Sequence, residues 1–496
     1  MRIAIIGGGA SAVCLTDALA TFVPWIGSLH VFENSPQIWR GRAYQQDMDT
    51  VLVNSPAVDM SVRSGDPTHF QRWLRARYMA VGRSVPDFAP RAVYGDYLVE
   101  VAQTGIERLR ARGWEVQTVQ RRITGARRGE RTLSLISDNL VYGPFDCVII
   151  AVGVGQPADR FGLEGLPGYV ADPYPMVERL VGIDPGAPVA VLGSGLTAVD
   201  TVLALDAFGH HGQVALLSRA GVLPSVRQRP IDYEPRHFVP AALHAMAGTN
   251  GRLEFSEVLA LLRRELDHAG AEMDDVLDEL ARLERELPSA RLQRHLAAVD
   301  SPRLGLRVLQ TAVHVSGPDL WPLLPDEVRR EVLGTRYRAL MSLCCPMPPS
   351  SARTLLASMR SGRLVVERGE PVLEAAPGGG FTAVLPHGTR RVARVINCTS
   401  APRHKVPLAA AGLVDSLVDQ QLAIRHADGG LCVGTDNSLC NSGAANRQPD
   451  DPRLYAIGDI TGGTFFFTFG IPSLVDRCRD IVLDLLMVGE SKESYV

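Results

Sequence analysis

Two short glycine-rich loops, 186 residues apart, constrain this 496-residue chain more than any other feature. The first loop is Gly7–Ala12 (GGGASA), which follows the apolar segment 2–6 and precedes residues with helical spacing. The second loop is Gly193–Ala198 (GSGLTA), which follows the apolar segment 189–192. Both fit the pattern G-x-G-x-x-G/A between a strand and a helix, the fingerprint of a dinucleotide-binding βαβ unit. The sequence therefore predicts an α/β fold with two Rossmann-like dinucleotide-binding domains.

Each loop position has a physical role in this fingerprint. The first glycine makes the tight turn, the second lets the backbone approach a pyrophosphate, and the small third residue lets the helix pack closely on the strand. The free N–H groups and positive dipole end of the helix then face the phosphates. A tight turn without a ligand is the alternative interpretation. The predicted positions are Gly7, Gly9 and Ala12 in the first loop, and Gly193, Gly195 and Ala198 in the second.

The ends of the second strands carry opposite charges in the two units. Glu33 and Arg219 each lie 26 residues after the first glycine of their loop. An acid in this slot accepts hydrogen bonds from an unmodified ribose, whereas an arginine accommodates a 2′-phosphate. Glu33 therefore favours FAD or NAD. Ser218 and Arg219, with Arg227 or Arg229 as candidate helpers, favour NADP, the alternative being a solvent-facing arginine beside a loop.

Composition excludes several classes of function. A net charge of −3 gives no indication of nucleic-acid binding, and no apolar run reaches the roughly 18 residues of a membrane span. The eight cysteines show neither C-x-x-C nor metal-ligand spacing, so we expect no bound metal and no disulfide reductase. The adjacent Cys344 and Cys345 are interpreted as structural. We expect a cytoplasmic protein, and the sequence leaves open whether it forms a homo-oligomer.

Several further segments give the chain a family resemblance. It resembles the two-dinucleotide-binding flavoproteins, and within them the FAD/NAD(P)-binding proteins related to flavin-dependent N-hydroxylating monooxygenases. The resemblance covers most of residues 1–235 and 390–480. The resemblance implies that FAD binds at the first loop and NADPH at the second. It also implies that the segment Gly458-Asp459 lies at the FAD, with Asp459 as the acid near its ribityl or pyrophosphate. The other matching segments are 41–44, 54–61, 90–98, 151–153, 218–221 and 397–400.

This resemblance also implies a domain order. We expect residues 1–165 to form the first part of an FAD-binding domain and 185–240 the first part of an NAD(P)-binding domain. Residues 241–350, which match no motif, are predicted to be a helical insertion. Residues 351–394 then return to the NAD(P)-binding domain and 395–496 to the FAD-binding domain.

The implied reaction is a flavin-dependent monooxygenation that uses NADPH and O₂. The enzyme would N-hydroxylate a small amine or amino acid through a flavin C4a-hydroperoxide. Asn54 is the candidate catalytic residue, because an amide can hydrogen-bond flavin or nicotinamide without a pKa requirement; the alternative is a capping role before Pro56. A dehydrogenase, oxidase or electron-transfer reductase without oxygen insertion stays open, as does a non-enzymatic redox sensor. The aromatic run 465–467 is expected to wall a dry pocket or to pack in the core.

Overall fold

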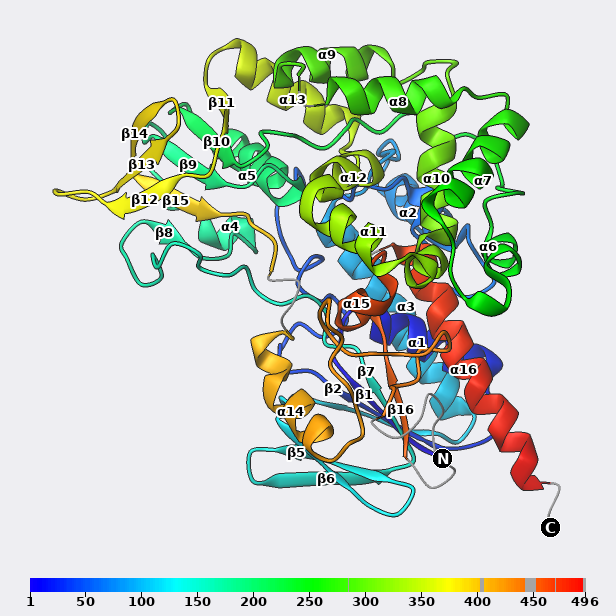
Figure 1. Ribbon diagram of the computed structural model, residues 1–496. Helices are drawn as coiled ribbons and strands as arrows, with labels where there is room; N and C mark the ends of the chain where they lie inside the picture. The colour runs from blue at the N-terminus through cyan, green and yellow to red at the C-terminus, as the bar shows by residue number, and fades with distance from the viewer. Residues whose placement is uncertain (284, 402–405, 442–451, 469, 494–496) are drawn as a thin grey trace.

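In the described part of the chain, two five-stranded parallel sheets, two three-stranded antiparallel sheets and a block of helices are found (Figure 1). The computed structural model describes residues 1–283, 285–401, 406–441, 452–468 and 470–493. We call the unit built on the first sheet the first domain and the unit built on the second sheet the second domain. This arrangement confirms the predicted fold class of two Rossmann-like domains with a helical insertion.

The first sheet has the strand order β16-β7-β1-β2-β3, with every neighbouring pair parallel. Its central strand is buried on both faces, which explains why segment 2–6 is a continuous apolar run rather than an alternating one. Three helices, α1, α3 and α16, cover one face. The bounds are β1 (Arg2–Ile6), α1 (Ala10–Phe22), β2 (Ser28–Phe32), α3 (Arg91–Ala111), β3 (Glu115–Val119), β7 (Cys147–Ile150), β16 (Arg453–Ala456) and α16 (Ile471–Glu493).

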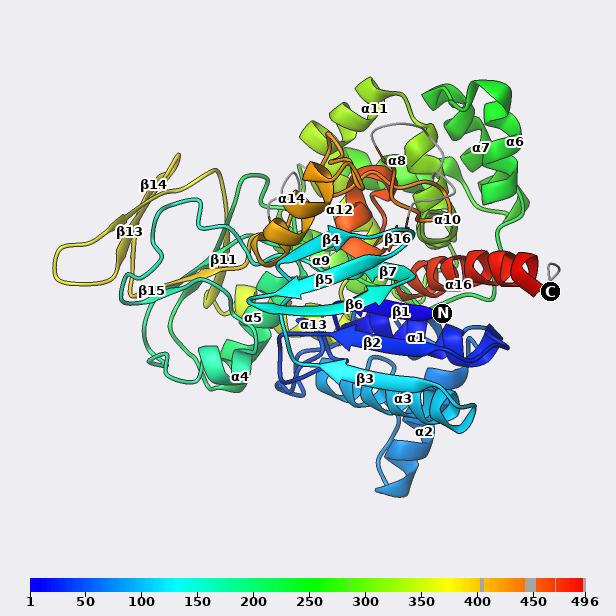
Figure 2. The same ribbon diagram turned by 90° about the horizontal axis from the view of Figure 1, so that it is seen from below.

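The opposite face of the first sheet is covered by a small antiparallel sheet and one helix. Figure 2 shows this small sheet in front of the first sheet. Its apolar residues form a common core with residues of β1 and β7, among them Ala4 and Val148. Its strands pair antiparallel, whereas β3, just before them in the chain, pairs in parallel with β2 in the first sheet. The bounds are β4 (Gly125–Arg128), β5 (Leu133–Ser137), β6 (Leu140–Phe145) and α14 (Ala411–Asp419).

The second sheet has the strand order β11-β10-β9-β15-β8 and repeats the same layering. Helices α5 and α13 cover one face, and the antiparallel sheet β12-β13-β14 covers the other. Because β15 pairs with β9, the predicted domain boundary at residue 394 falls inside a strand of this sheet. The bounds are β8 (Tyr169–Val170), α4 (Met176–Arg179), β9 (Val189–Leu192), α5 (Leu196–Ala207), β10 (Val214–Ser218), α13 (Pro349–Arg360), β11 (Leu364–Arg368), β12 (Val372–Ala375), β13 (Phe381–Leu385), β14 (Gly388–Val392) and β15 (Arg394–Asn397).

Between β10 and α13 the chain forms the predicted helical block, which we call the insertion. Leucines, valines and Trp321 give α6, α7 and α10 a core of their own, whereas α9 packs on α13 within the core of the second sheet. Helix α10 packs against α16, so the insertion lies over the first domain as well as the second (Figure 1). The bounds are α6 (Pro240–Ala247), α7 (Phe255–His268), α8 (Met273–Arg282), α9 (Pro288–Ala297), α10 (Gly305–Leu320), α11 (Asp326–Glu331) and α12 (Tyr337–Cys344); in the first domain, α2 is His69–Ala80.

Candidate dinucleotide sites and the junction between them

The first glycine-rich loop has a backbone that demands glycine at its first position. Gly7 has a φ of +109°, and a Cβ there would lie 2.1 Å from the carbonyl oxygen of Ala151. Gly9 instead caps α1 with a φ of −94°, and its added Cβ would lie 3.5 Å from Cα of Gly41. Ala12, in the first turn of α1, is fully buried. The three positions therefore adopt the turn, approach and packing geometry of the fingerprint, and their binding of a nucleotide stays a prediction.

Glu33 lies beside this loop at the carboxyl end of β2. Its Oε2 accepts a hydrogen bond from the Gly8 amide at 2.8 Å, and its Oε1 accepts one from the Ser35 amide at 2.8 Å. Each carboxylate oxygen keeps a further lone pair for a ribose hydroxyl. Gly458 and the exposed Asp459 follow β16 at the same edge of the sheet, and a Cβ at Gly458 would lie 3.5 Å from Ser11 Oγ. The structure thus brings the predicted residues of the first site together.

The second glycine-rich loop repeats this geometry. Gly193 has a φ of +107°, and a Cβ there would lie 2.9 Å from the carbonyl oxygen of Cys398. Gly195 caps α5 with a φ of −84°, and Ala198 is fully buried. The Gly193 amide donates to the carbonyl oxygen of Leu217 at 2.8 Å, which ties the loop to the end of β10. The two loops therefore share the same backbone conformation.

Two arginines stand where β10 and β11 end. Ser218 closes β10, and its Oγ lies 2.9 Å from Ser194 Oγ and accepts from the Gly221 amide at 3.0 Å. The exposed Arg219 follows it. Exposed Arg368 lies opposite Ser218 in the parallel register of the two strands. Sequence reasoning missed Arg368, because only the pairing of β10 with a strand far along the chain brings it to this edge.

Asn54 lies where the two domains meet the insertion. Its carbonyl oxygen accepts a hydrogen bond from Arg227 Nη2 at 3.2 Å, and Arg227 Nη1 donates to Gln310 Oε1 at 3.4 Å. Burial lowers the pKa of Arg227, and burial also raises the pKa of Asp59, against the opposing effect of the Arg227 charge. Nε of Arg227 is buried without a partner among the described residues. The junction therefore holds a poorly neutralised cation beside the predicted catalytic residue.

This placement changes the interpretation of three sequence candidates. Arg227 was a candidate to bind a 2′-phosphate together with Arg219. In the structure it donates a hydrogen bond to Asn54 at the junction instead. Arg229 pairs with Asp300 at 2.6 Å on the surface. The alternative capping role of Asn54 gains no support, because the short 3₁₀ helix after Pro56 has no side-chain cap. Its role at the flavin stays a prediction.

A cluster of polar contacts locks the two domains together near both loops. Arg91, at the start of α3, contacts Asp200 of α5 at 2.8 Å, and the Tyr174 hydroxyl donates to the same carboxylate at 2.6 Å. Arg42 makes a bidentate pair with Asp172 at 2.6 and 2.9 Å. Bidentate and buried pairs hold their partners in one geometry. The cluster therefore fixes α5, which starts at the second loop, relative to the first domain.

The aromatic run after Asp459 divides between core and pocket. Phe466 stacks on Trp321 of the insertion with ring centroids 4.4 Å apart. Phe467 lines a small pocket that also includes Gly458, and Phe465 lines the same pocket while it is buried in the core of the first domain. Both alternatives raised by the sequence are therefore present in neighbouring residues.

Other chemistry is sparse in the structure. All eight cysteines are free, and burial raises the pKa of Cys344, which keeps its thiol protonated. No group of three metal-ligating side chains occurs within the described ranges. Among the helices that the structure describes, none is long and apolar enough to cross a membrane.

Comparisons with known proteins agree with the fold. Residues 4–155 match the FAD-NAD(P)-binding family, so this part of the chain is a FAD/NAD(P)-binding domain. No curated protein matches the sequence. Among solved structures, the chain is similar to L-lysine 6-monooxygenase from Pseudomonas syringae, with 14% identity, a TM-score of 0.61, and coverage of 98% of this chain and 99% of that one.

Two further solved structures match over the same extent. One is the ornithine N-hydroxylase of Kutzneria sp. 744, with 15% identity, a TM-score of 0.54, and coverage of 98% of this chain and 99% of that one. The other is the ornithine hydroxylase of Pseudomonas aeruginosa, with 16% identity, a TM-score of 0.53 and 98% coverage of both chains. The predicted resemblance to two-dinucleotide-binding flavoproteins is confirmed at the level of the fold.

Proposed function

We propose that this chain is an FAD-dependent, NADPH-using monooxygenase that N-hydroxylates a small amine or amino acid. The observation that carries the proposal is the pairing of two glycine loops that differ in one slot, Glu33 in the first and Arg219 in the second, within a fold similar over its whole length to amine N-hydroxylases. No two cysteines have C-x-x-C spacing, which argues against a flavoprotein that reduces disulfides.

The residues of the first loop fit FAD. The space that a Cβ would fill at Gly9 is open apart from Gly41, which leaves room for a pyrophosphate against the start of α1. Glu33 is already held in place by two backbone amides and presents its remaining lone pairs to a ribose. Bound FAD would accept hydride from NADPH and activate O₂. We assign Gly458 and Asp459 to the same cofactor from their place at this sheet edge.

The second loop and the junction would serve NADPH and the substrate. Arg219, with Arg368 beside it, would bind the 2′-phosphate through charge-assisted hydrogen bonds. Asn54 would orient the nicotinamide or flavin through its amide. Arg227 and Gln310 connect the insertion to the first domain at the junction, which would exclude water there. The amine would bind at this junction.

The test is purification with bound flavin, followed by a screen of NADPH oxidation against amino acids and small amines under ¹⁸O₂. We expect one substrate to stimulate NADPH oxidation and to give a hydroxylamine carrying one ¹⁸O atom. A dehydrogenated product without ¹⁸O would replace the proposal with a dehydrogenase or oxidase. Nucleotide binding without any substrate-stimulated turnover would indicate a redox sensor instead.

A further inference from the structure

Arg338 of the insertion places its guanidinium directly against the second glycine loop. Its Nη1 lies 3.5 Å from the point that a Cβ at Gly195 would occupy. Its Nη2 donates to the Ser194 carbonyl oxygen at 2.5 Å and to the Val222 carbonyl oxygen at 2.8 Å. Nε also donates to the Val222 carbonyl oxygen, at 3.1 Å. The guanidinium therefore bridges the loop after β9 and the loop after β10.

Among the residues that the structure describes, this cation has no counter-charge. All acceptors that it contacts in the described part of the chain are carbonyl or hydroxyl oxygens, and no carboxylate there lies within ion-pair distance. Nη1 makes no hydrogen bond to any described residue. Burial lowers the pKa of Arg338 to about 10, so the group stays charged at neutral pH. The positive dipole end of α5 begins at Gly195 and adds to the same unbalanced field.

Helix α12 is held in place independently of any ligand. Ser342, one turn after Arg338, donates through Oγ to the Leu223 carbonyl oxygen at 2.7 Å, and its own carbonyl oxygen accepts from the Ser225 amide at 2.9 Å. Arg291 of α9 donates to Leu223 O at 2.9 Å and to Ser342 Oγ at 3.1 Å. Arg291 therefore ties α12 to the loop after β10.

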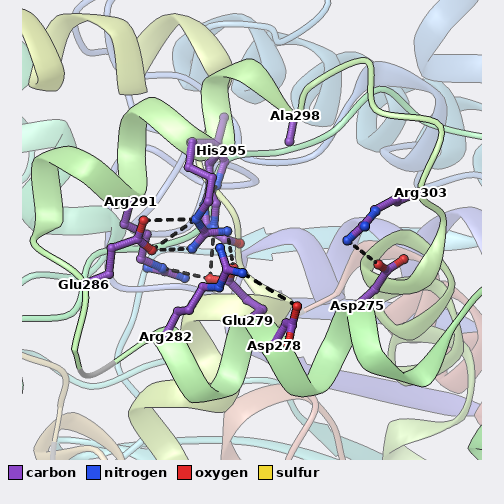
Figure 3. Close-up of polar contacts among 12 residues, drawn as sticks. Asp275, Asp278, Glu279, Arg282, Glu286, Arg291, His295, Ala298 and Arg303 are labelled. Atoms are coloured by element: carbon purple, nitrogen blue, oxygen red, sulfur yellow. Dashed lines mark hydrogen bonds and ion pairs between the residues drawn. The ribbon is translucent and has the colours of Figure 1, made fainter.

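Arg291 is in turn anchored by a buried ion cluster, shown in Figure 3. Glu279 of α8 lies 2.9 Å from Arg291 Nε and 2.7 Å from Arg294 Nη1, and it accepts a hydrogen bond from His295 Nε2 at 2.9 Å. Nδ1 of His295 accepts from the Val226 amide at 3.3 Å, which fixes the neutral tautomer with the proton on Nε2. This cluster fixes Arg291, and Arg291 fixes the helix that carries Arg338. The position of Arg338 is therefore set by the packing of the insertion.

We propose that Arg338 binds the pyrophosphate of the dinucleotide at the second loop. The inference rests on the proposed function in taking that ligand to be NADP(H). The position favours the pyrophosphate over the 2′-phosphate, because Nη1 faces the approach position at Gly195, whereas Arg219 and Arg368 stand at the strand ends. The insertion thereby contributes to the nucleotide site as well as covering the first domain.

Isothermal titration of the FAD-loaded protein with two ligands tests this assignment. NADP⁺ carries both the pyrophosphate and the 2′-phosphate, whereas adenosine 2′-monophosphate carries only the latter. We expect Arg338→Gln to weaken NADP⁺ binding about ten- to a hundredfold and to leave adenosine 2′-monophosphate unchanged. The matched control Arg219→Ala should weaken both ligands. Arg338→Lys should bind NADP⁺ with intermediate affinity, because it keeps the charge and loses the planar fork.

Each other result has a distinct meaning. Unchanged or tighter NADP⁺ binding by Arg338→Gln would overturn the proposal and identify Arg338 as a structural or blocking residue. Equal weakening of both ligands would overturn it in favour of a role in shaping the adenosine end. Circular dichroism shows whether Arg338→Gln folds. If it does not, wild-type NADP⁺ affinity in Arg338→Lys would overturn the proposed contact between the planar guanidinium and the pyrophosphate. A wild-type protein that binds neither ligand would instead contradict the proposed function itself.

Discussion

Gly9 can be changed without disturbing the protein that surrounds it, which separates nucleotide binding from folding. Its φ of −94° and ψ of −161° are open to alanine, and the added Cβ would meet only Cα of Gly41 at 3.5 Å, an ordinary contact. The free energy of unfolding of the protein without nucleotide should therefore change by less than about 1 kcal/mol. The new methyl group would occupy the approach path of the pyrophosphate.

The expected loss falls on FAD. Lifting the pyrophosphate off the start of α1 would break about two charge-assisted hydrogen bonds from backbone amides, which together are worth roughly 3 kcal/mol or more. We therefore expect Gly9→Ala to bind FAD more than about a hundredfold more weakly. Flavin absorbance of the purified protein and titration of the apoprotein with FAD measure this.

Gly7→Ala is the matched control. At a φ of +109°, with a Cβ 2.1 Å from the Ala151 carbonyl oxygen, alanine must distort the turn itself. We expect a loss of several kcal/mol in stability, or no folded protein. Wild-type FAD affinity in Gly9→Ala would show that no pyrophosphate approaches there. Unfolding of Gly9→Ala would refute the steric argument.

Three further predictions concern charge. Arg219→Ala should raise the Kd for NADP⁺ about ten- to a hundredfold and leave that for NAD⁺ unchanged; equal losses for both would show that Arg219 does not contact the 2′-phosphate. Burial raises the pKa of Glu279. Hydrogen bonds from His295 and Arg294, together with the charge of Arg291, outweigh burial and lower this pKa from 4.5 to about 2. Its ionised form therefore stabilises the fold by about 3 kcal/mol above pH 4.5, and this contribution disappears as the pH falls through 2. Glu279→Gln should accordingly be less stable than wild type at pH 7 and equally stable near pH 2, and a difference independent of pH in denaturant unfolding would contradict the pairing. Product formation with an aliphatic amine should accelerate between about pH 7 and 9, because only the unprotonated amine reacts and its ordinary pKa is near 10; a flat profile of hydroxylated product would argue against this step.

The sequence predicted the conformation of the two glycine-rich loops, because the determinants of that conformation are local. A strand, a glycine turn and a helix follow one another within about fifteen residues of each loop, so periodicity and composition suffice. Glu33 and Arg219 could be placed for the same reason, since each directly follows the second strand of its unit. The approach positions Gly9 and Gly195 have nearly the same conformation, as their shared pattern implies.

Residues brought in by distant segments could not be placed in this way. Arg227 was associated with Arg219 because the two are close in sequence. In the fold, the Arg227 amide donates to the Met347 carbonyl oxygen at 2.8 Å, and the Met347 amide donates to Ser225 at 2.7 Å. This pairing with the segment before α13 carries Arg227 away from the strand end. Arg338 is the converse case, since it reaches Ser194 across 144 residues through helices whose packing no local pattern specifies.

The two strand-end charges also differ in how far they are organised before a ligand binds. Glu33 already accepts hydrogen bonds from two backbone amides at 2.8 Å, so little side-chain freedom remains to be lost when a ribose binds. Arg219 is exposed, and ordering such a side chain costs up to about 2 kcal/mol. We therefore expect the first nucleotide to stay bound through purification and the second to exchange in each turnover. That is the division of labour between a resident flavin and a diffusible hydride donor, and it follows from the organisation of the sites rather than from their shared glycine pattern.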